Sequence, residues 1–168
     1  MHYVSWDRTE RDAPKLLAEA GPDVLGVFRT DRASVGGEIW DLAVSPESGA
    51  VATRGGEEIV RAFDSLRRGD EVRVDVEGRG YTLVKETSNN WVIDDAAGEK
   101  VAQFSRANSG VRKAILEFEG DTALPLTDVA ALAWLSRSVM ESRQTASANA
   151  LIAALTLFSA VAVLVFFL

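Results

Sequence analysis

The feature that most constrains this chain is a long uncharged segment at its C-terminal end. No charged residue lies between Gln144 and Leu168, and only Thr156 and Ser159 are polar within residues 150–168. A helix over these residues is about 28 Å long, close to the thickness of a bilayer's hydrocarbon core. Because apolar side chains cover every face of such a helix, the pattern is typical of a membrane span and not of a surface helix.

The sequence therefore predicts a transmembrane anchor over residues 150–168, preceded by a short linker at 144–149. The alternative is a helix buried in the core of a soluble domain, but domains of this size seldom enclose so long an apolar run. The side chains that define the predicted anchor are Ala150, Leu151, Leu155, Phe158, Leu164, Phe166 and Phe167.

Charges beside the anchor predict its orientation. Arg137 and Arg143 lie before the segment and no charge lies after it, so the positive-inside rule places residues 1–143 in the cytoplasm. The first thirty residues contain no uninterrupted apolar run of the kind found in signal peptides. We therefore expect a tail-anchored, single-pass protein of the cell membrane.

Composition excludes several classes of function. The formal net charge is −7, from 25 acidic and 18 basic residues, which argues against nucleic-acid binding because that requires a basic surface. The chain has no cysteine and its single histidine is His2, so disulfides, thiolate chemistry and a multi-histidine metal site are excluded. No nucleophile–base pair is recognisable. We expect neither an enzyme nor a bound cofactor.

The N-terminal half is expected to mix strands with short helices. A helix is predicted over residues 13–20, where Gly21-Pro22 ends it. A second helix is predicted over residues 57–68, which begin acidic, end basic and meet a glycine. Strands are predicted at residues 24–29, 38–44 and 49–54.

From Glu71 onward the pattern predicts a meander of half-buried antiparallel strands. Residues 71–77 alternate valines with charged side chains, and turn residues separate this strand from the following ones. Sequential strands joined by short turns normally pair with their neighbours. The expected strands cover residues 71–77, 81–85, 91–94, 100–105 and 111–119.

An apolar core helix is predicted over residues 127–141, with Thr127 as its N-cap and Asp128 favourable to the helix dipole. Every residue from Val129 to Leu135 is apolar, so we expect the helix to be enclosed at its start. Its second half turns polar at Arg137 and is expected to leave the domain toward the membrane. All four tryptophans lie in apolar contexts and are predicted to be core residues: Trp6, Trp40, Trp91 and Trp134.

Two stretches carry a resemblance to a known family. Residues 91–102 read WVIDDAAGEKVA, an apolar strand ending in an Asp-containing glycine turn before a second strand. Residues 114–118 form an apolar strand that leads through Leu124-Pro125-Leu126 into the helix from Val129. These stretches resemble the recurring hairpin and the strand before the central helix in the tubby C-terminal-like superfamily, which includes the LURP-one-related and phospholipid scramblase families.

The resemblance covers about residues 71–143 and implies a closed antiparallel barrel around the apolar helix. It also implies a membrane-associated, often lipid-facing protein without a conventional catalytic centre. An incomplete or rearranged barrel is the alternative, because the N-terminal half supplies few convincing strands. The basic phosphoinositide pocket of tubby domains has no equivalent cluster that can be carried over to this sequence.

Two groups of side chains are candidates for binding. Asp94, Asp95 and Glu99 offer oxygens of the kind that Ca²⁺ prefers, but Asp beside Gly is ordinary turn chemistry, so no metal site is predicted. Basic residues also cluster around one predicted hairpin, where they contact lipid headgroups if they share a face toward the membrane and otherwise decorate an exposed sheet. These are Arg67, Arg68, Arg73, Arg79 and Lys85.

The expected fold is therefore mainly β with a few helices, an antiparallel meander or barrel of tubby-like type around an apolar helix, with one C-terminal transmembrane helix. The expected function is that of a tethered binding or scaffold module, held by its anchor near membrane lipid and an unidentified membrane-protein partner. The alternatives are an accessory subunit of a membrane protein complex and a sensor of lipid headgroups.

Overall fold

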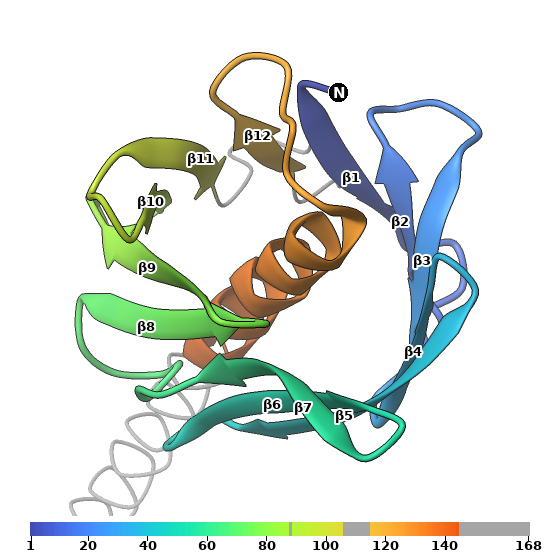
Figure 1. Ribbon diagram of the computed structural model, residues 1–168, viewed down its shortest axis with the longest axis horizontal. Helices are drawn as coiled ribbons and strands as arrows, with labels where there is room; N and C mark the ends of the chain where they lie inside the picture. Colours follow the sequence, from blue (N-terminus) through green and yellow to red (C-terminus); the bar gives the residue numbers. More distant parts are fainter. Residues whose placement is uncertain (88, 106–114, 145–168) are drawn as a thin grey trace, which may run out of the picture.

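The chain folds into a closed barrel of antiparallel strands. The computed structural model describes residues 1–87, 89–105 and 115–144, and these residues form twelve strands and one helix, over residues 126–144. Figure 1 shows the helix inside the ring of strands. The strands are β1 (Tyr3–Asp7), β2 (Lys15–Ala18), β3 (Val24–Phe28), β4 (Arg32–Val35), β5 (Glu38–Ser45), β6 (Gly49–Arg54), β7 (Glu57–Ala62), β8 (Glu71–Val76), β9 (Arg79–Lys85), β10 (Asn90–Asp95), β11 (Lys100–Ser105) and β12 (Ile115–Phe118).

Each strand pairs with its neighbours in sequence, and the first strand closes the ring against the last. Val4 of β1 lies opposite Leu116 of β12, and His2 accepts a backbone hydrogen bond from Phe118 at 2.8 Å. The N-terminal ammonium also forms an ion pair with Asp121. Closure removes both sheet edges, which removes the unpaired backbone groups that an open sheet exposes. The expected alternative of an incomplete barrel is therefore wrong.

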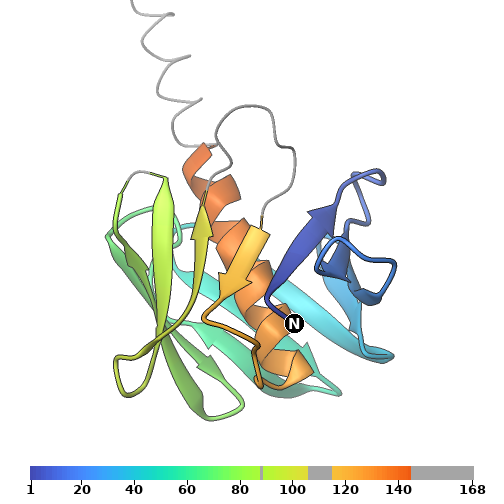
Figure 2. The ribbon, with the colours of Figure 1, turned by 90° about the horizontal axis from the view of Figure 1, so that it is seen from above.

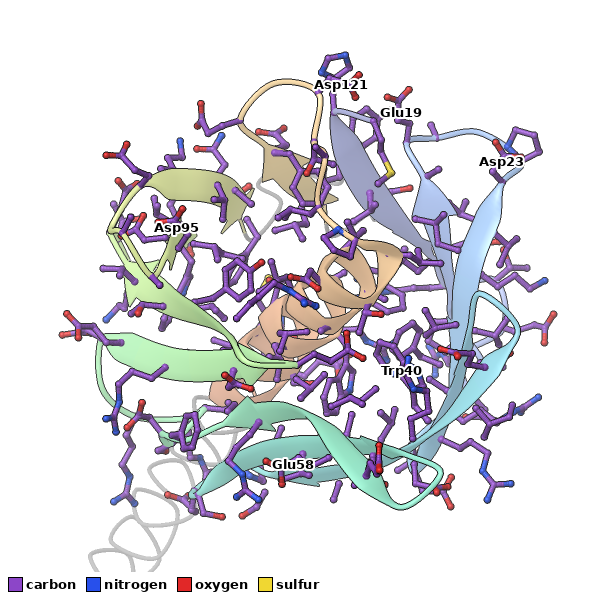
Figure 3. All side chains as sticks on the ribbon, in the orientation of Figure 1. Glu19, Asp23, Trp40, Glu58, Asp95 and Asp121 are labelled. Atoms are coloured by element: carbon purple, nitrogen blue, oxygen red, sulfur yellow. The ribbon has the colours of Figure 1, made fainter. Side chains whose placement is uncertain are left out.

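The core lies between the inner face of the barrel and the helix. Every residue from Asp128 to Ser136 is at most 5% exposed, so the helix is enclosed on all sides, as the apolar run predicts. The four tryptophans are also buried. Figure 3 shows Trp40 pointing from the wall of the barrel into its interior. The helix begins one residue earlier than expected, which places Thr127 in its first turn and not at the N-cap.

The meander expected from Glu71 onward is present as β8 to β12. Val72, Val74 and Val76 face inward and are at most 3% exposed, which confirms the inward face that alternation predicted. The expected strand at residues 111–119 is described only from Ile115. The earlier strands predicted at 24–29, 38–44 and 49–54 are confirmed as β3, β5 and β6.

Both short helices predicted in the N-terminal half are wrong. Residues 13–20 contain β2 instead, in which Leu16 is fully buried between β1 and β3. Residues 57–68 contain β7 and a loop. Gly55 and Gly56 have φ of +60° and +87°, the signs that a two-residue hairpin turn requires, and they return β7 along β6. Pairing within the barrel overrides the local helix signals here.

No helix among the residues described is long and apolar enough to cross a membrane. The predicted linker at 144–149 and anchor at 150–168 lie outside the described residues, apart from Gln144. The anchor therefore stays a prediction.

Candidate functional site

The candidate site lies at the end of the barrel where the helix residues 137–144 are found. We call this end the mouth. It is surrounded by the loops at residues 8–14, 29–31, 46–48 and 63–70. Figure 2 shows the helix running obliquely through the barrel, from the end that holds the N-terminus to the mouth.

Two arginines of the last helical turns contact different parts of the barrel wall at the mouth. The Arg137 guanidinium lies 5.1 Å from the ring centroid of Trp6 in β1 and donates to Glu141 at 2.7 Å. The Arg143 guanidinium lies 4.6 Å from the ring centroid of Trp91 in β10 and donates to the Gly69 carbonyl at 2.6 Å. Desolvation by burial lowers the pKa of Arg143 below its ordinary value.

These contacts change one expectation about the helix. The polar second half was expected to leave the domain from Arg137, yet Ser138, Val139 and Ser142 are at most 7% exposed. The helix therefore stays within the barrel as far as Arg143. Cations in a last helical turn also complement the helix dipole, and stacking on an aromatic face adds to this attraction.

A pocket of about 240 Å³ lies inside the mouth, between the helix and the wall formed by β3 and β5. Val44 faces into it, because it follows the inward-pointing Trp40 and Leu42 at alternate positions of β5. Those two residues are at most 7% exposed, but Val44 is 41% exposed. Phe28 and Trp134 also line this space. We call it the mouth pocket.

Charged side chains form the rim of the mouth pocket. Arg11, Arg29 and Arg137 line it, together with Asp12 and Glu141. A shallower groove of about 510 Å³ continues outward from the pocket, since both are lined by Arg11, Pro14, Arg137 and Glu141, and Arg8 flanks this groove. Pocket and groove thus contain four arginines and two carboxylates.

Three of the four arginines at this rim carry no ion pair with another described residue. Arg8, Arg11 and Arg29 are exposed, and none of them forms an ion pair with another residue in the described part of the chain. With four arginines against two carboxylates, the mouth holds an excess of positive charge beside an apolar surface. Such a combination suits a ligand that is anionic at one end and apolar at the other.

The predicted basic residues are divided between the two ends of the barrel. Arg67 and Arg68 lie in the loop at the mouth and Lys85 ends β9 there, whereas Arg79 lies at the opposite end. All five are already paired with carboxylates. The ion pairs are Arg67–Glu47 at 2.7 Å, Arg68–Glu47 at 3.5 Å, Arg73–Asp64 at 2.9 Å, Lys85–Asp70 at 2.9 Å and Arg79–Asp128 at 2.6 Å.

At the opposite end a charged network holds the start of the helix. The fully buried Asp128 accepts hydrogen bonds from Arg79 Nε at 2.7 Å and from the Tyr81 hydroxyl at 2.5 Å. The hydrogen bond to Asp128 raises the pKa of Arg79, and burial together with Asp128 raises the pKa of Tyr81. Glu77 accepts from Arg79 at 3.1 Å and from Arg54 at 2.7 Å. Because the buried Asp128 carboxylate is fully paired, we interpret this network as structural: it holds the start of the helix in place.

The carboxylates considered for Ca²⁺ lie in an ordinary turn. Asp95 accepts hydrogen bonds from the backbone of Ala97 at 2.8 Å and Glu99 at 3.0 Å, which is the geometry of an Asx turn. Among the residues that the structure describes, no group of three or more metal-ligating side chains is found.

Comparisons with known proteins identify no relative. No family model matches the chain, and no curated protein or solved structure is significantly similar to it. The resemblance to the tubby-like superfamily therefore stays a prediction.

Sequence reasoning did not single out Arg8, Arg11 and Arg29 of the mouth. Arg8 and Arg11 lie in the loop after β1, Arg29 follows β3, and only the helix brings Arg137 beside them. Their spacing in sequence is irregular, so no motif marks them. The alternation of Trp40, Leu42 and Val44 was visible, but the exposure of its last member depends on the small serines opposite it on the helix.

Proposed function

We propose that this protein is a membrane-tethered binding module, anchored by residues 150–168 with the mouth of the barrel toward the bilayer. The observation that carries the proposal is the place where the described part of the helix stops. Residue 144, the last one described, lies at the mouth and is the first residue of the predicted linker. Six residues, 144–149, reach about 20 Å at full extension, so an anchor that begins at residue 150 holds this end near the membrane.

Charge supports the same orientation. The opposite end carries many carboxylates; the mouth carries carboxylates too, but also Arg8, Arg11 and Arg29, which form no ion pair with any described residue. The cytoplasmic leaflet is anionic, which favours basic groups at the membrane surface and disfavours acidic ones. Figure 3 shows four of the carboxylates around the rim of the barrel. The acidic side chains at that end include Glu19, Asp23, Asp95, Glu99, Glu119 and Asp121.

A binding role fits the interior of the barrel better than a catalytic one. The helix fills the interior, and the charged network at the far end is fully paired. The mouth pocket is the place where apolar surface and uncompensated charge meet. A tether at this end raises the effective concentration of the pocket near membrane components.

Membrane fractionation of the full chain tests the anchor. We expect the wild-type chain to remain in the membrane pellet after an alkaline carbonate wash. Leu155→Arg/Phe158→Arg should release it, because each arginine at the centre of a span costs about 3 kcal/mol. Leu155→Val/Phe158→Leu is the matched control and should stay in the pellet. A charged variant that still pellets shows that the anchor is not residues 150–168.

Co-purification separates the module from an accessory subunit. The full-length chain and its charged-anchor variant are both tagged and purified from membranes or cytosol in mild detergent. Partners recovered with both forms are recognised by the barrel, as we propose. Partners recovered at fixed stoichiometry with the wild-type chain only indicate that the anchor itself assembles with other helices, which favours the accessory-subunit alternative.

A further inference from the structure

The mouth pocket exists because small side chains on the helix leave space beside Val44. Opposite Val44 the helix presents Ser138 and Ser142, two small side chains one turn apart, both lining the pocket. Larger residues at these positions would fill the space, as Leu132 and Leu135 do deeper in the barrel, where both are fully buried. An inward-facing valine that remains 41% exposed shows that the described residues do not cover this surface.

The floor and the rim of the pocket differ in chemistry. Its floor is made by Phe28, Val44 and Trp134, whereas Arg11 and Arg29 stand at its rim without ion pairs among the described residues. A free inorganic anion would use only the rim, and a neutral apolar molecule only the floor. A ligand that uses both has an anionic headgroup joined to an apolar chain.

We propose that the mouth pocket binds a single-chain anionic amphiphile from the adjoining membrane leaflet. Its headgroup lies among Arg11, Arg29 and Arg137, and the first part of its chain contacts Phe28, Val44 and Trp134. A volume of about 240 Å³ is below that of a typical ligand site, so the rest of the chain lies along the outer groove beside Arg8. The proposed tether supplies only the source of the ligand, and the pocket itself does not depend on it.

Arg137 is held in position for this role. Its pairing with Glu141 and its stacking on Trp6 orient the guanidinium, so little side-chain entropy is lost when it meets an anion. Arg11 and Arg29 are exposed and supply the charge that Glu141 does not balance. Hydrogen bonds from arginine to a carboxylate or phosphate are among the strongest available to such a headgroup.

Photolabelling of the full-length protein in phosphatidylcholine nanodiscs tests the proposal. The probe is decanoic acid carrying a diazirine near its carboxyl end, where the chain is proposed to enter the mouth pocket, and labelled peptides are mapped by mass spectrometry. We expect labels on the peptides that contain Val44 or Trp134. Unlabelled decanoate and decyl phosphate should both compete with the probe. Decanol lacks the charged headgroup and inorganic phosphate lacks the apolar chain, so each should compete at least about tenfold less well.

Two variants should reduce the labelling of these peptides. Arg11→Gln/Arg29→Gln removes two exposed charges that form no ion pair with a described residue, does not touch the core, and should weaken competition by decanoate about tenfold or more. Ser138→Leu should block the pocket by filling it. The matched control is Arg67→Gln/Arg68→Gln, which removes two arginines of the same mouth outside the pocket and should leave labelling unchanged.

Several results would overturn the proposal. The proposal is wrong if the Arg11/Arg29 variant leaves the labelling of the pocket peptides unchanged, or if the Arg67/Arg68 control loses as much labelling. It is also wrong if decanol or inorganic phosphate competes as well as decanoate. Absence of pocket labels in a chain that still pellets with membranes contradicts this inference alone and leaves the tether intact. Pocket labelling that persists in the released Leu155→Arg/Phe158→Arg variant supports the pocket even though the tether is lost.

Discussion

At the scale of single residues, Asp128 has the most demanding environment in the barrel. Its carboxylate is fully buried and accepts hydrogen bonds from Arg79 and Tyr81. A buried charge without partners is strongly destabilising, whereas a paired one holds two elements in register. Asp128 thereby ties the first turn of the helix to β9 and sets how deeply the helix enters the barrel.

Asp128→Asn should destabilise the protein by roughly 3 kcal/mol, the low end of the range for a broken buried pair, because Arg79 stays partly hydrated. Glu77→Gln is the matched control, since Glu77 is the exposed carboxylate on the same arginine, and it should cost less than about 1 kcal/mol. Urea unfolding of the full chain in nonionic micelles measures both. Equal losses in the two variants would show that Asp128 has no special structural role.

At the scale of elements, bulges explain why the N-terminal strands were hard to recognise. In β7 the register passes from Val60 opposite Ala52 to Glu58 opposite Thr53, which leaves Ile59 as an extra residue. Ile59 and Val60 are therefore both buried, and the alternation that identifies a strand is broken. The acidic start and basic end of residues 57–68 then resembled a helix.

The connection from β7 to β8 is predicted to depend on acid pH. Asp64 accepts hydrogen bonds from the Arg73 side chain at 2.9 and 3.0 Å, and this contact lowers the pKa of Asp64. A lowered folded-state pKa means that the stabilisation is complete above the unfolded value, about 4, and is lost as pH falls through the folded value.

Arg73→Gln should therefore reduce the urea midpoint at pH 7 and reduce it less at pH 3, because falling pH progressively protonates the Asp64 carboxylate. Because Arg73 is 68% exposed, we expect a loss of at most about 1 kcal/mol at pH 7. Arg8→Gln, which breaks no ion pair among the described residues, serves as the control. A deficit that is the same at both pH values would contradict the role of the Asp64 charge.

At the scale of the whole molecule, the helix is the shared core of a barrel closed by β1 and β12. Strands on all sides of the ring place buried side chains toward it. Damage to the helix should consequently affect strands that are distant from each other in sequence, because they pack on a common element.

Leu132→Ala should lower the free energy of unfolding by about 2 to 5 kcal/mol through the cavity that it leaves, since Leu132 is fully buried. Amide hydrogen exchange should accelerate together in β1, β5 and β9. Ile39→Ala is the control, because Ile39 is 52% exposed on the outer surface, and it should change little. Faster exchange confined to one strand would show that the helix does not couple the barrel.

Much of the second half of the molecule was predictable because its signals are local. Strict alternation at Val72, Val74 and Val76 predicted an inward face, and the apolar run from Val129 to Leu135 predicted an enclosed helix. In the first half, bulges interrupted the alternation of buried and exposed residues that identifies a strand. Charged residues at the ends of residues 57–68 then favoured a helix prediction. There, pairing with neighbouring strands decided the structure.

The sequence by itself determined which elements are half-buried, that one helix is enclosed, and that an uncharged segment lies beyond it, because period and composition act over a few neighbouring residues. Only the tertiary structure decided that the barrel closes and where the candidate site lies. Closure pairs Val4 with Leu116, and the mouth joins Arg11, Arg29 and Arg137. Contacts between residues so distant in the chain leave no local sequence pattern, because the loop-closure entropy that they cost is offset only when the whole core forms.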